Sequence, residues 1–428
     1  MIDRTTAPKL NVIDQLEISS PEHATLDNGI PVFLFDAGAQ EIVRIDFLFE
    51  AGSRYQQHPL VARFTNKMLS EGTKSYTAFE IAEKLDYYGA YLGKMAFKDT
   101  GIVCISMLNK HIENILPIIA EIITEPVFPE KELQTISKRA KQAYIDDRLK
   151  VSEMAAMHFN QQLFGKKHPY GKIVEVSDFD QVKPEYLKDF HKTYYIPDSC
   201  KIVVSGKAPA DIMALLNRYF GHFKTTEVAR AKEAAFTLSS GNKHEFIAMS
   251  KSVQSAIRIG NIGISKRHED YPAFFVLNTI LGGYFGSRLM KNIREDKGYT
   301  YGIYSTTVQL QESALFFIST EVGSDVCHNA ITEIHHEFDH LRSELVTETE
   351  LDLVKKYLSG SILRSFDGPF QTAERFKNLL ELNIDFKNYY SNLIHVINTI
   401  TAKDLMITAQ KYFVEEGMFE MVVGKKTV

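Results

Sequence analysis

The sequence predicts an α+β protein of two homologous domains, each a mainly antiparallel sheet packed with helices. Three observations support this fold class: a long internal repeat, a hairpin signal that leads into a strand, and amphipathic helical segments. The chain has 428 residues, of which 44% are hydrophobic. It therefore has enough material for two cores without disulfides or a structural metal.

The internal repeat relates two helix-and-strand units. Residues 182–207 begin with VKPEYL and end with VVSGK, and residues 400–425 begin with ITAKDL and end with VVGK. The offset is 218 residues (400 − 182), and it also relates Glu132 to Glu350, each of which opens a long helical stretch. Since solenoid repeats are only about 20 to 50 residues long, this period indicates two homologous domains.

The boundary between the domains is predicted in residues 225–243. This stretch is rich in charged and small residues and has no sustained strand or helix periodicity. We expect it to be a linker between an N-terminal domain, 1–224, and a C-terminal domain, 244–428. Each side is long enough for a domain of ordinary size.

Local patterns give the first elements of the N-terminal domain. Asn28-Gly29 between short apolar runs predicts a tight hairpin. Over 43–50, apolar residues alternate with polar ones, as in a half-buried strand. Residues 112–123 place aliphatic side chains on one helical face, and residues 131–148 predict a long, highly charged helix.

Composition and charge exclude several classes of function. The formal net charge of −5 favours no nucleic-acid partner. Cys104, Cys200 and Cys327 are an odd number and far apart, so we expect buried thiols and not a disulfide framework or zinc knuckle. Neither a signal-peptide pattern nor an apolar run long enough to span a bilayer is present. We therefore expect no membrane partner and a cytoplasmic location, or a periplasmic one if a leader has been removed.

The segment RFTNK at 63–67 carries the first chemical signal. With GSRY before it and MLSEGT after it, it resembles the N-terminal half of the pitrilysin/insulinase-type (M16) zinc peptidases. At this place the family has an inverted zinc motif, His-x-x-Glu-His. Arg63 and Lys67 stand at the two histidine positions, and Asn66 stands at the position of the catalytic glutamate. Two cations one turn apart on a helix would repel Zn²⁺, so the zinc motif is degenerate.

The resemblance covers nearly the whole chain and implies a metallohydrolase-like fold. The third zinc ligand of the family, a glutamate on a later helix, aligns near Arg139, where the segment ISKRA has no carboxylate. The loop FGKKHPYG at 164–171 also looks like a recurrent loop of the family. The resemblance thus implies no metal site and no cofactor in this chain, with zinc in a partner subunit.

A second signal lies in the C-terminal domain. The segments LGGYFGSRL at 281–289 and IREDKGYTY at 293–301 resemble the family's glycine-rich turn and its paired arginine and tyrosine. On that alignment Arg294 and Tyr301 are the pair, and the resemblance implies that they bind the peptide carbonyl and stabilise the oxyanion. A guanidinium and a phenolic hydroxyl suit this catalytic role because both are fixed donors where negative charge develops.

The same resemblance assigns substrate binding to Gly282, Gly283, Tyr284 and Phe285. The residues alone leave a simpler interpretation open. Arg294 could be an exposed arginine that pairs with the acidic residues after it, and Tyr301 could be packed in a strand.

A third pattern, His336-Glu337-Phe338-Asp339-His340, matches the His-Glu-x-x-His helix of another peptidase class. The surrounding helix is predicted to be amphipathic, and its apolar stripe comprises Ile331, Ile334, Phe338, Leu341 and Leu345. His336 and His340 would point away from this stripe toward solvent. We therefore expect no catalytic zinc here, although His335, His336 and His340 could bind metal adventitiously.

These observations predict the non-zinc subunit of a two-component M16-type zinc metallopeptidase. It would be inactive alone and would form a heterodimer with a zinc-bearing M16 subunit to hydrolyse extended peptides. The alternative is a non-catalytic structural or peptide-binding homologue. Independent activity through the His336 segment is a third interpretation.

Overall fold

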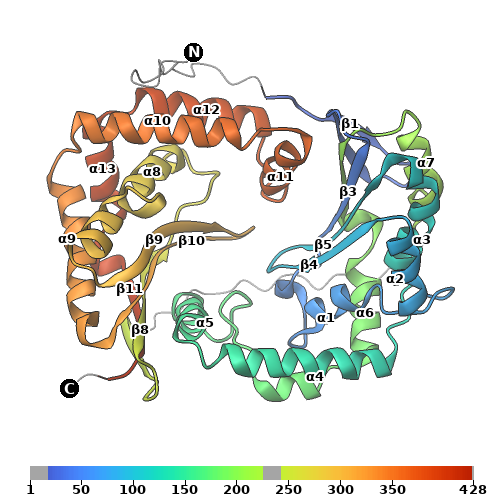
Figure 1. Ribbon diagram of the computed structural model, residues 1–428, viewed down its shortest axis with the longest axis horizontal. Helices are drawn as coiled ribbons and strands as arrows, with labels where there is room; N and C mark the ends of the chain where they lie inside the picture. The colour runs from blue at the N-terminus through green and yellow to red at the C-terminus, as the bar shows by residue number, and fades with distance from the viewer. Residues whose placement is uncertain (1–17, 225–241, 427–428) are drawn as a thin grey trace, which may run out of the picture.

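The computed structural model describes residues 18–224 and 242–426, which form two halves side by side (Figure 1). The sheets lie toward the middle, and most helices lie on the outside. In the part of the chain so described, no helix has the length and apolar character needed to cross a bilayer. The predicted linker, 225–243, falls almost wholly outside the described residues, so the domain boundaries stay a prediction.

The first sheet is formed by the N-terminal half and has the strand order β1-β2-β6-β3-β5-β4. All its neighbours are antiparallel except β2 and β6. The strands are β1 Glu22–Thr25, β2 Pro31–Asp36, β3 Ile42–Phe49, β4 Tyr91–Ala96, β5 Gly101–Leu108 and β6 Cys200–Gly206.

The second sheet has the order β7-β11-β8-β10-β9, and again one pair, β7 and β11, is parallel. Its strands are β7 His244–Ala248, β8 Gln254–Ile262, β9 Thr300–Gln309, β10 Ala314–Gly323 and β11 Phe419–Gly424. This order repeats that of β2-β6-β3-β5-β4. The α+β fold class with two homologous sheets is therefore confirmed.

The helices connect and cover these strands. In the N-terminal half they are α1 Val61–Met68, α2 Ala78–Tyr87, α3 Ile112–Thr124, α4 Glu130–Asp147, α5 Val151–Phe164, α6 Pro184–Tyr194 and α7 Ile212–Phe220. In the C-terminal half they are α8 Tyr271–Asn278, the π-helices η5 Thr279–Gly283 and η6 Met290–Asp296, α9 Cys327–Ser343, α10 Glu348–Arg364, α11 Pro369–Leu380, α12 Phe386–Thr399 and α13 Ala402–Tyr412. Short 3₁₀ turns join several of them, including η1 Ser53–Tyr55.

Several predicted elements are confirmed. Gly29 has a φ of +90° in the turn between β1 and β2, where few residues other than glycine are comfortable. The predicted helices at 112–123 and 131–148 are α3 and α4. Cys104 and Cys200 are buried, as expected, whereas Cys327 is only half-buried.

The two halves exchange a helix each across the middle. α5 comes from the N-terminal half but packs on β8 and β11 of the second sheet, through residues such as Ala155 and Phe159. α11 comes from the C-terminal half and packs on β2 and β6 of the first sheet, where the rings of Phe376 and Phe35 lie 5.3 Å apart. Each sheet is thus covered on one face by a helix from the other half, so neither half completes its core alone.

This exchange corrects the prediction of a half-buried strand over 43–50. Val43, Ile45 and Phe47 of β3 face the first core as expected. The opposite face is also covered, because α11 lies over it, and Asp46 is 0% exposed.

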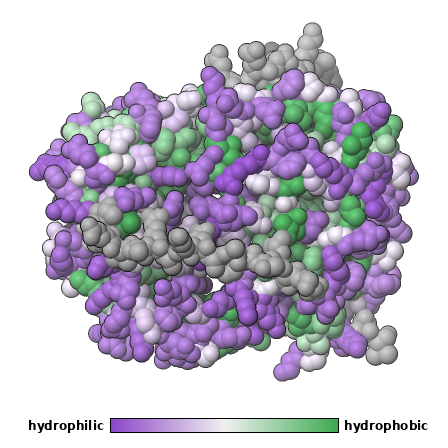
Figure 2. Space-filling view, turned by 180° about the vertical axis from the view of Figure 1, so that it is seen from behind, coloured by the Kyte–Doolittle hydropathy of each residue, from purple (hydrophilic) through white to green (hydrophobic). Residues whose placement is uncertain are grey.

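The rear view of the molecule is mostly hydrophilic, with hydrophobic residues in separate small groups (Figure 2).

Asp46 belongs to a charged network that joins β3 to α11. Its Oδ1 accepts hydrogen bonds from the Arg44 guanidinium, with a shortest distance of 2.9 Å to Nη2. The Lys377 Nζ lies 3.1 Å from Asp46 Oδ2, and the two form an ion pair whose angles do not meet those of a hydrogen bond. The same Nζ lies 2.8 Å from Glu374 Oε1. Two ions buried this deeply depend on each other, because each would otherwise lack solvation.

We expect Lys377→Met to destabilise the protein by about 3 kcal/mol, because Asp46 would lose a buried counter-ion at the contact between the halves. Thermal unfolding followed by circular dichroism measures this loss. Lys356→Met, which removes an exposed lysine paired with Asp352 on α10, is the matched control and should change stability by less than about 0.5 kcal/mol. Equal unfolding temperatures for the two variants would contradict a stabilising role of the network.

Candidate functional site

The degenerate zinc motif lies on α1, and its three positions differ in their surroundings. Arg63 and Lys67 are exposed one turn apart. Asn66 is 2% exposed, and its Nδ2 donates to the Ile102 carbonyl and to the Tyr195 hydroxyl, each at 3.1 Å. Asn66 therefore anchors α1 to the sheet and to the residue that follows α6, and its side chain is not free for chemistry.

These residues do not fit zinc. Two cations and an amide that is already hydrogen-bonded offer none of the imidazole, thiolate or carboxylate ligands that hold Zn²⁺. Arg139, near the predicted third position, is exposed on α4. Within residues 18–224 and 242–426, no group of three or more His, Cys, Asp and Glu side chains is arranged to hold a metal ion.

The His-Glu-x-x-His segment lies on α9, and its two histidines are exposed as predicted. Glu337 is buried and accepts a hydrogen bond of 2.8 Å from Asn292 Nδ2, so it is held within the structure. His335 lies 3.8 Å from both Glu415 and Glu420. One detail of the prediction was wrong: Leu345 lies beyond the end of α9 and is 57% exposed.

The glycine-rich turn follows α8, which runs directly into the π-helix η5. A Cβ on Gly282 would lie 2.6 Å from the backbone N of Ser305 on β9, so only glycine allows this close approach. Tyr284 packs against Tyr357 of α10, with ring centroids 4.8 Å apart. Phe285 extends outward and is 64% exposed.

Arg294 and Tyr301 lie near this turn, and no hydrogen bond joins their two side chains in the described structure. Arg294, on η6, places its guanidinium 4.7 Å from the Phe285 ring centroid, a cation–π contact, and 4.0 Å from Glu295. Tyr301, on β9, is 94% exposed. Tyr301 therefore lies in a strand but is not packed there. Arg294 is partly exposed beside Glu295, as the simpler interpretation predicts for it.

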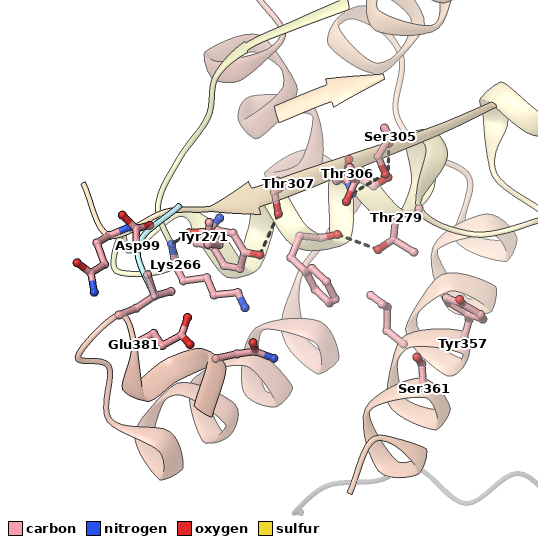
Figure 3. Close-up of a pocket in the computed structure, with 18 residues that line it drawn as sticks. Asp99, Lys266, Tyr271, Thr279, Ser305, Thr306, Thr307, Tyr357, Ser361 and Glu381 are labelled. Carbon is pink, nitrogen blue, oxygen red and sulfur yellow. Dashed lines mark hydrogen bonds between the residues drawn. The ribbon is translucent and has the colours of Figure 1, made fainter. Parts of the chain in front are cut away.

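A pocket of about 480 Å³ lies beside the turn, where the two halves meet. Gly283 is the one predicted substrate-binding residue that lines it. Asp99, Lys266 and Glu381 lie at one end of the pocket, whereas Thr279, Tyr357 and Ser361 lie at the other (Figure 3). The remaining wall is formed by Tyr271, Phe275, Asn278, Ser305, Thr306, Thr307, Gln309, Gln311, Leu358, Asn378 and Leu382.

The charged end of the pocket is built on the contact between the halves. The turn between β9 and β10 inserts Gln311 into the N-terminal half, where its backbone N donates to Asp99 Oδ2 at 3.1 Å and its Oε1 accepts from Tyr55 Oη at 3.1 Å. Arg54 Nη1 donates to Asp99 Oδ1 at 3.3 Å and to Tyr170 Oη at 3.1 Å. This network holds Asp99 at the mouth of the pocket.

Burial shifts the titration of two charged groups in this pocket. It raises the pKa of the Glu381 carboxyl to about 7, and the negative charge of Asp99 acts in the same direction. Burial, with the positive charge of Arg375, lowers the pKa of the Lys266 ammonium to about 8. Both groups therefore titrate near neutral pH, as groups in functional sites often do.

Comparisons with known proteins cover most of the chain. A family profile described as "Insulinase (Peptidase family M16)" matches residues 32–171, and one described as "Peptidase M16 inactive domain" matches residues 181–358. This chain belongs to the M16 peptidase family. A Bacillus subtilis relative named "Uncharacterized zinc protease YmxG" is 23% identical over 407 residues, which cover 93% of this chain and 97% of the relative. A Rickettsia felis relative named "Uncharacterized zinc protease" is 23% identical over 399 residues, or 91% of this chain and 94% of the relative.

Solved structures of M16 proteins have the same fold. A peptidase M16 inactive domain from Pseudomonas fluorescens superposes with a TM-score of 0.86 at 23% identity, covering 96% of this chain and 99% of that one. A protease from Helicobacter pylori also gives 0.86, at 18% identity, covering 95% and 100%. The periplasmic protease PqqL from Escherichia coli gives 0.78 at 16% identity, and this chain covers 48% of it.

Sequence reasoning missed the charged residues of the pocket. Lys266 follows β8, Glu381 follows α11, and Asp99 comes from the other half of the chain. Charged residues make up 24% of the sequence, and no spacing distinguishes these three from the rest. Only the folded structure identifies them, because it brings residues of α8, α10, α11 and β9 to the wall of one pocket.

The raised pKa of Glu381 predicts a pH-dependent effect on stability. A carboxyl whose folded pKa lies above its ordinary value of 4.5 gives its full stabilisation below that value and loses it as the pH rises through about 7. Glu381→Gln should therefore stabilise the protein at pH 8, by at most about 3 kcal/mol, with little difference at pH 5. Differential scanning calorimetry at the two pH values measures this.

The exposed glutamate Glu83 on α2 provides the control, because Glu83→Gln changes a carboxylate that is in water in both states. It should shift the unfolding temperature equally at both pH values. If Glu381→Gln were destabilising at pH 8, the positive charges of Lys377 and Lys201 would outweigh the burial of the carboxyl, contrary to the raised pKa.

Proposed function

We propose that this chain is the non-zinc subunit of a two-component M16-type zinc metallopeptidase. The observation that carries this proposal is the contrast between its two predicted sites. The motif positions on α1 hold two exposed cations and an amide that is already hydrogen-bonded, and these groups cannot bind zinc. By contrast, near the glycine-rich turn Tyr301 is 94% exposed, and Arg294 is partly exposed beside the Phe285 ring.

In this proposal the partner, an M16 chain with an intact zinc motif, supplies the metal-activated water and the general base. The present chain supplies hydrogen-bond donors to the substrate. Arg294 and Tyr301 would hold the peptide carbonyl and stabilise the negative charge that develops on its oxygen. The Phe285 ring beneath the Arg294 guanidinium restricts that side chain, which favours a preformed geometry.

The peptide would bind in an extended conformation along a sheet edge. β4 and β9 are edge strands of their sheets and leave backbone groups free to pair with another chain. Exposed aromatic side chains accompany both edges: Tyr91 on β4, and Tyr301 and Tyr304 on β9. Main-chain pairing tolerates varied sequences, so we expect broad selectivity for short, unfolded peptides.

A structural or peptide-binding protein without a hydrolytic partner is the second candidate. The description of the Pseudomonas fluorescens structure as an inactive domain favours it. It predicts peptide binding that needs no zinc-bearing chain and no contribution from Arg294. The cytoplasmic location expected from the sequence is part of our proposal.

The proposal predicts the effect of Arg294→Ala in the reconstituted complex. With a zinc-bearing M16 chain added, the variant should lower kcat by on the order of 10²-fold with the zinc content of the complex intact, because one oxyanion donor is lost. Fluorogenic peptide hydrolysis measures the rate. Arg218→Ala, which removes an exposed arginine on α7, is the control and should leave kcat unchanged.

Two results would count against the assigned role. Equal kcat for Arg294→Ala and the unaltered chain would exclude a role of Arg294 in stabilising the oxyanion. Peptide binding by this chain, measured by fluorescence anisotropy, with no hydrolysis in the presence of a zinc-bearing chain would favour the second candidate.

A further inference from the structure

The pocket between the halves contains two opposite charges that form no close ion pair. Neither Lys266 nor Glu381 forms an ion pair with any residue in the described ranges. The Lys266 Nζ lies 5.9 Å from the centroid of the Tyr389 ring, a cation–π contact. Both side chains are half-buried, and charges that are partly removed from water are normally paired.

The wall also contains an unused acceptor. Asn278 is 8% exposed, and its Nδ2 donates to the Ser305 carbonyl at 3.4 Å, whereas its Oδ1 has no hydrogen-bond partner. Buried polar atoms in native proteins are almost always satisfied. The unpaired cation, the unpaired carboxyl and this oxygen line the same space.

The arrangement of the charges selects the ligand. Lys266 and Glu381 enter the charged end from different elements, the loop after β8 and the end of α11, and Asp99 adds a second carboxyl there (Figure 3). A simple anion would face two carboxyls, and a simple cation would face Lys266 and the nearby Arg375. A group with both an ammonium and a carboxylate would satisfy both sides at once.

We propose that this pocket binds a free α-amino acid, with its carboxylate on Lys266 and its ammonium on Glu381. The side chain of the ligand would extend toward the other end, where Tyr357 lies near the hydroxyl groups of Thr279 and Ser361 (Figure 3). Phe275 and Leu358 add apolar surface to the wall of the pocket. A volume of about 480 Å³ is within the range of small-molecule sites and suits one amino acid with a large apolar side chain. This proposal does not rest on the peptidase function.

Occupancy of the pocket should also stabilise the contact between the halves. Asp99 and Gln311 both line the pocket, and both belong to the network that joins the β9–β10 turn to the N-terminal half. A ligand bound there would hold groups from both halves. It should therefore raise the unfolding temperature, because it binds the folded state and not the unfolded chain.

Isothermal titration calorimetry on the full chain tests the ligand class directly. L-Phenylalanine and L-leucine are the probes, and N-acetyl-phenylalanine and phenylalaninamide are the matched ligands that lack the ammonium or the carboxylate. We expect the free amino acids to bind and each blocked form to bind at least about tenfold more weakly. No binding of either free amino acid, or equal binding of the blocked forms, would overturn the proposal.

Variants then test which side chain recognises which end. In Lys266→Met, phenylalanine and phenylalaninamide should bind with equal affinity, because the partner of the carboxylate is gone. In Glu381→Gln, phenylalanine and its N-acetyl form should bind with equal affinity, because the partner of the ammonium is gone. Lys251→Met, at an exposed lysine outside the pocket, should retain the discrimination of the unaltered chain. Discrimination that survives both pocket substitutions would place the amino acid elsewhere.

Discussion

Each sheet of this protein is closed on one face by a helix that comes from the other half of the chain. α5 covers β8 and β11, and α11 covers β2 and β6, so the two cores form together. The buried pair of Asp46 and Lys377 follows from this exchange, since α11 brings the lysine over a strand face that would otherwise meet water. The pocket follows from it too, because α11 carries Glu381 to the junction where Asp99 and Gln311 meet.

Much of the architecture could be predicted from local patterns. The Asn28-Gly29 turn, the aliphatic face of α3 and the 218-residue offset each depend on residues close in sequence or on simple repetition, and the two sheets have the same strand order. The helix exchange could not be predicted in this way. An aspartate in an alternating strand indicates a solvent-facing position, and only a distant helix makes Asp46 a buried ion.

The candidate site, too, could be predicted from the sequence only in part. Arg63, Asn66 and Lys67 could be identified because they replace a motif of fixed spacing, and the glycine-rich turn because its spacing to Arg294 and Tyr301 is short. The structure adds what spacing cannot give: Asn66 joins α1 to Ile102 and Tyr195. A glutamate in that position would place a carboxylate in a buried environment, whereas the neutral amide satisfies both neighbours.

The proposed role requires that this chain holds no zinc of its own. The decisive measurement is the zinc content of the chain, purified alone without a histidine tag and dialysed against a weak chelator, by plasma mass spectrometry. We predict far less than one zinc per chain. One tightly held zinc per chain would contradict the account, and His335, His336 and His340 would be the first residues to substitute.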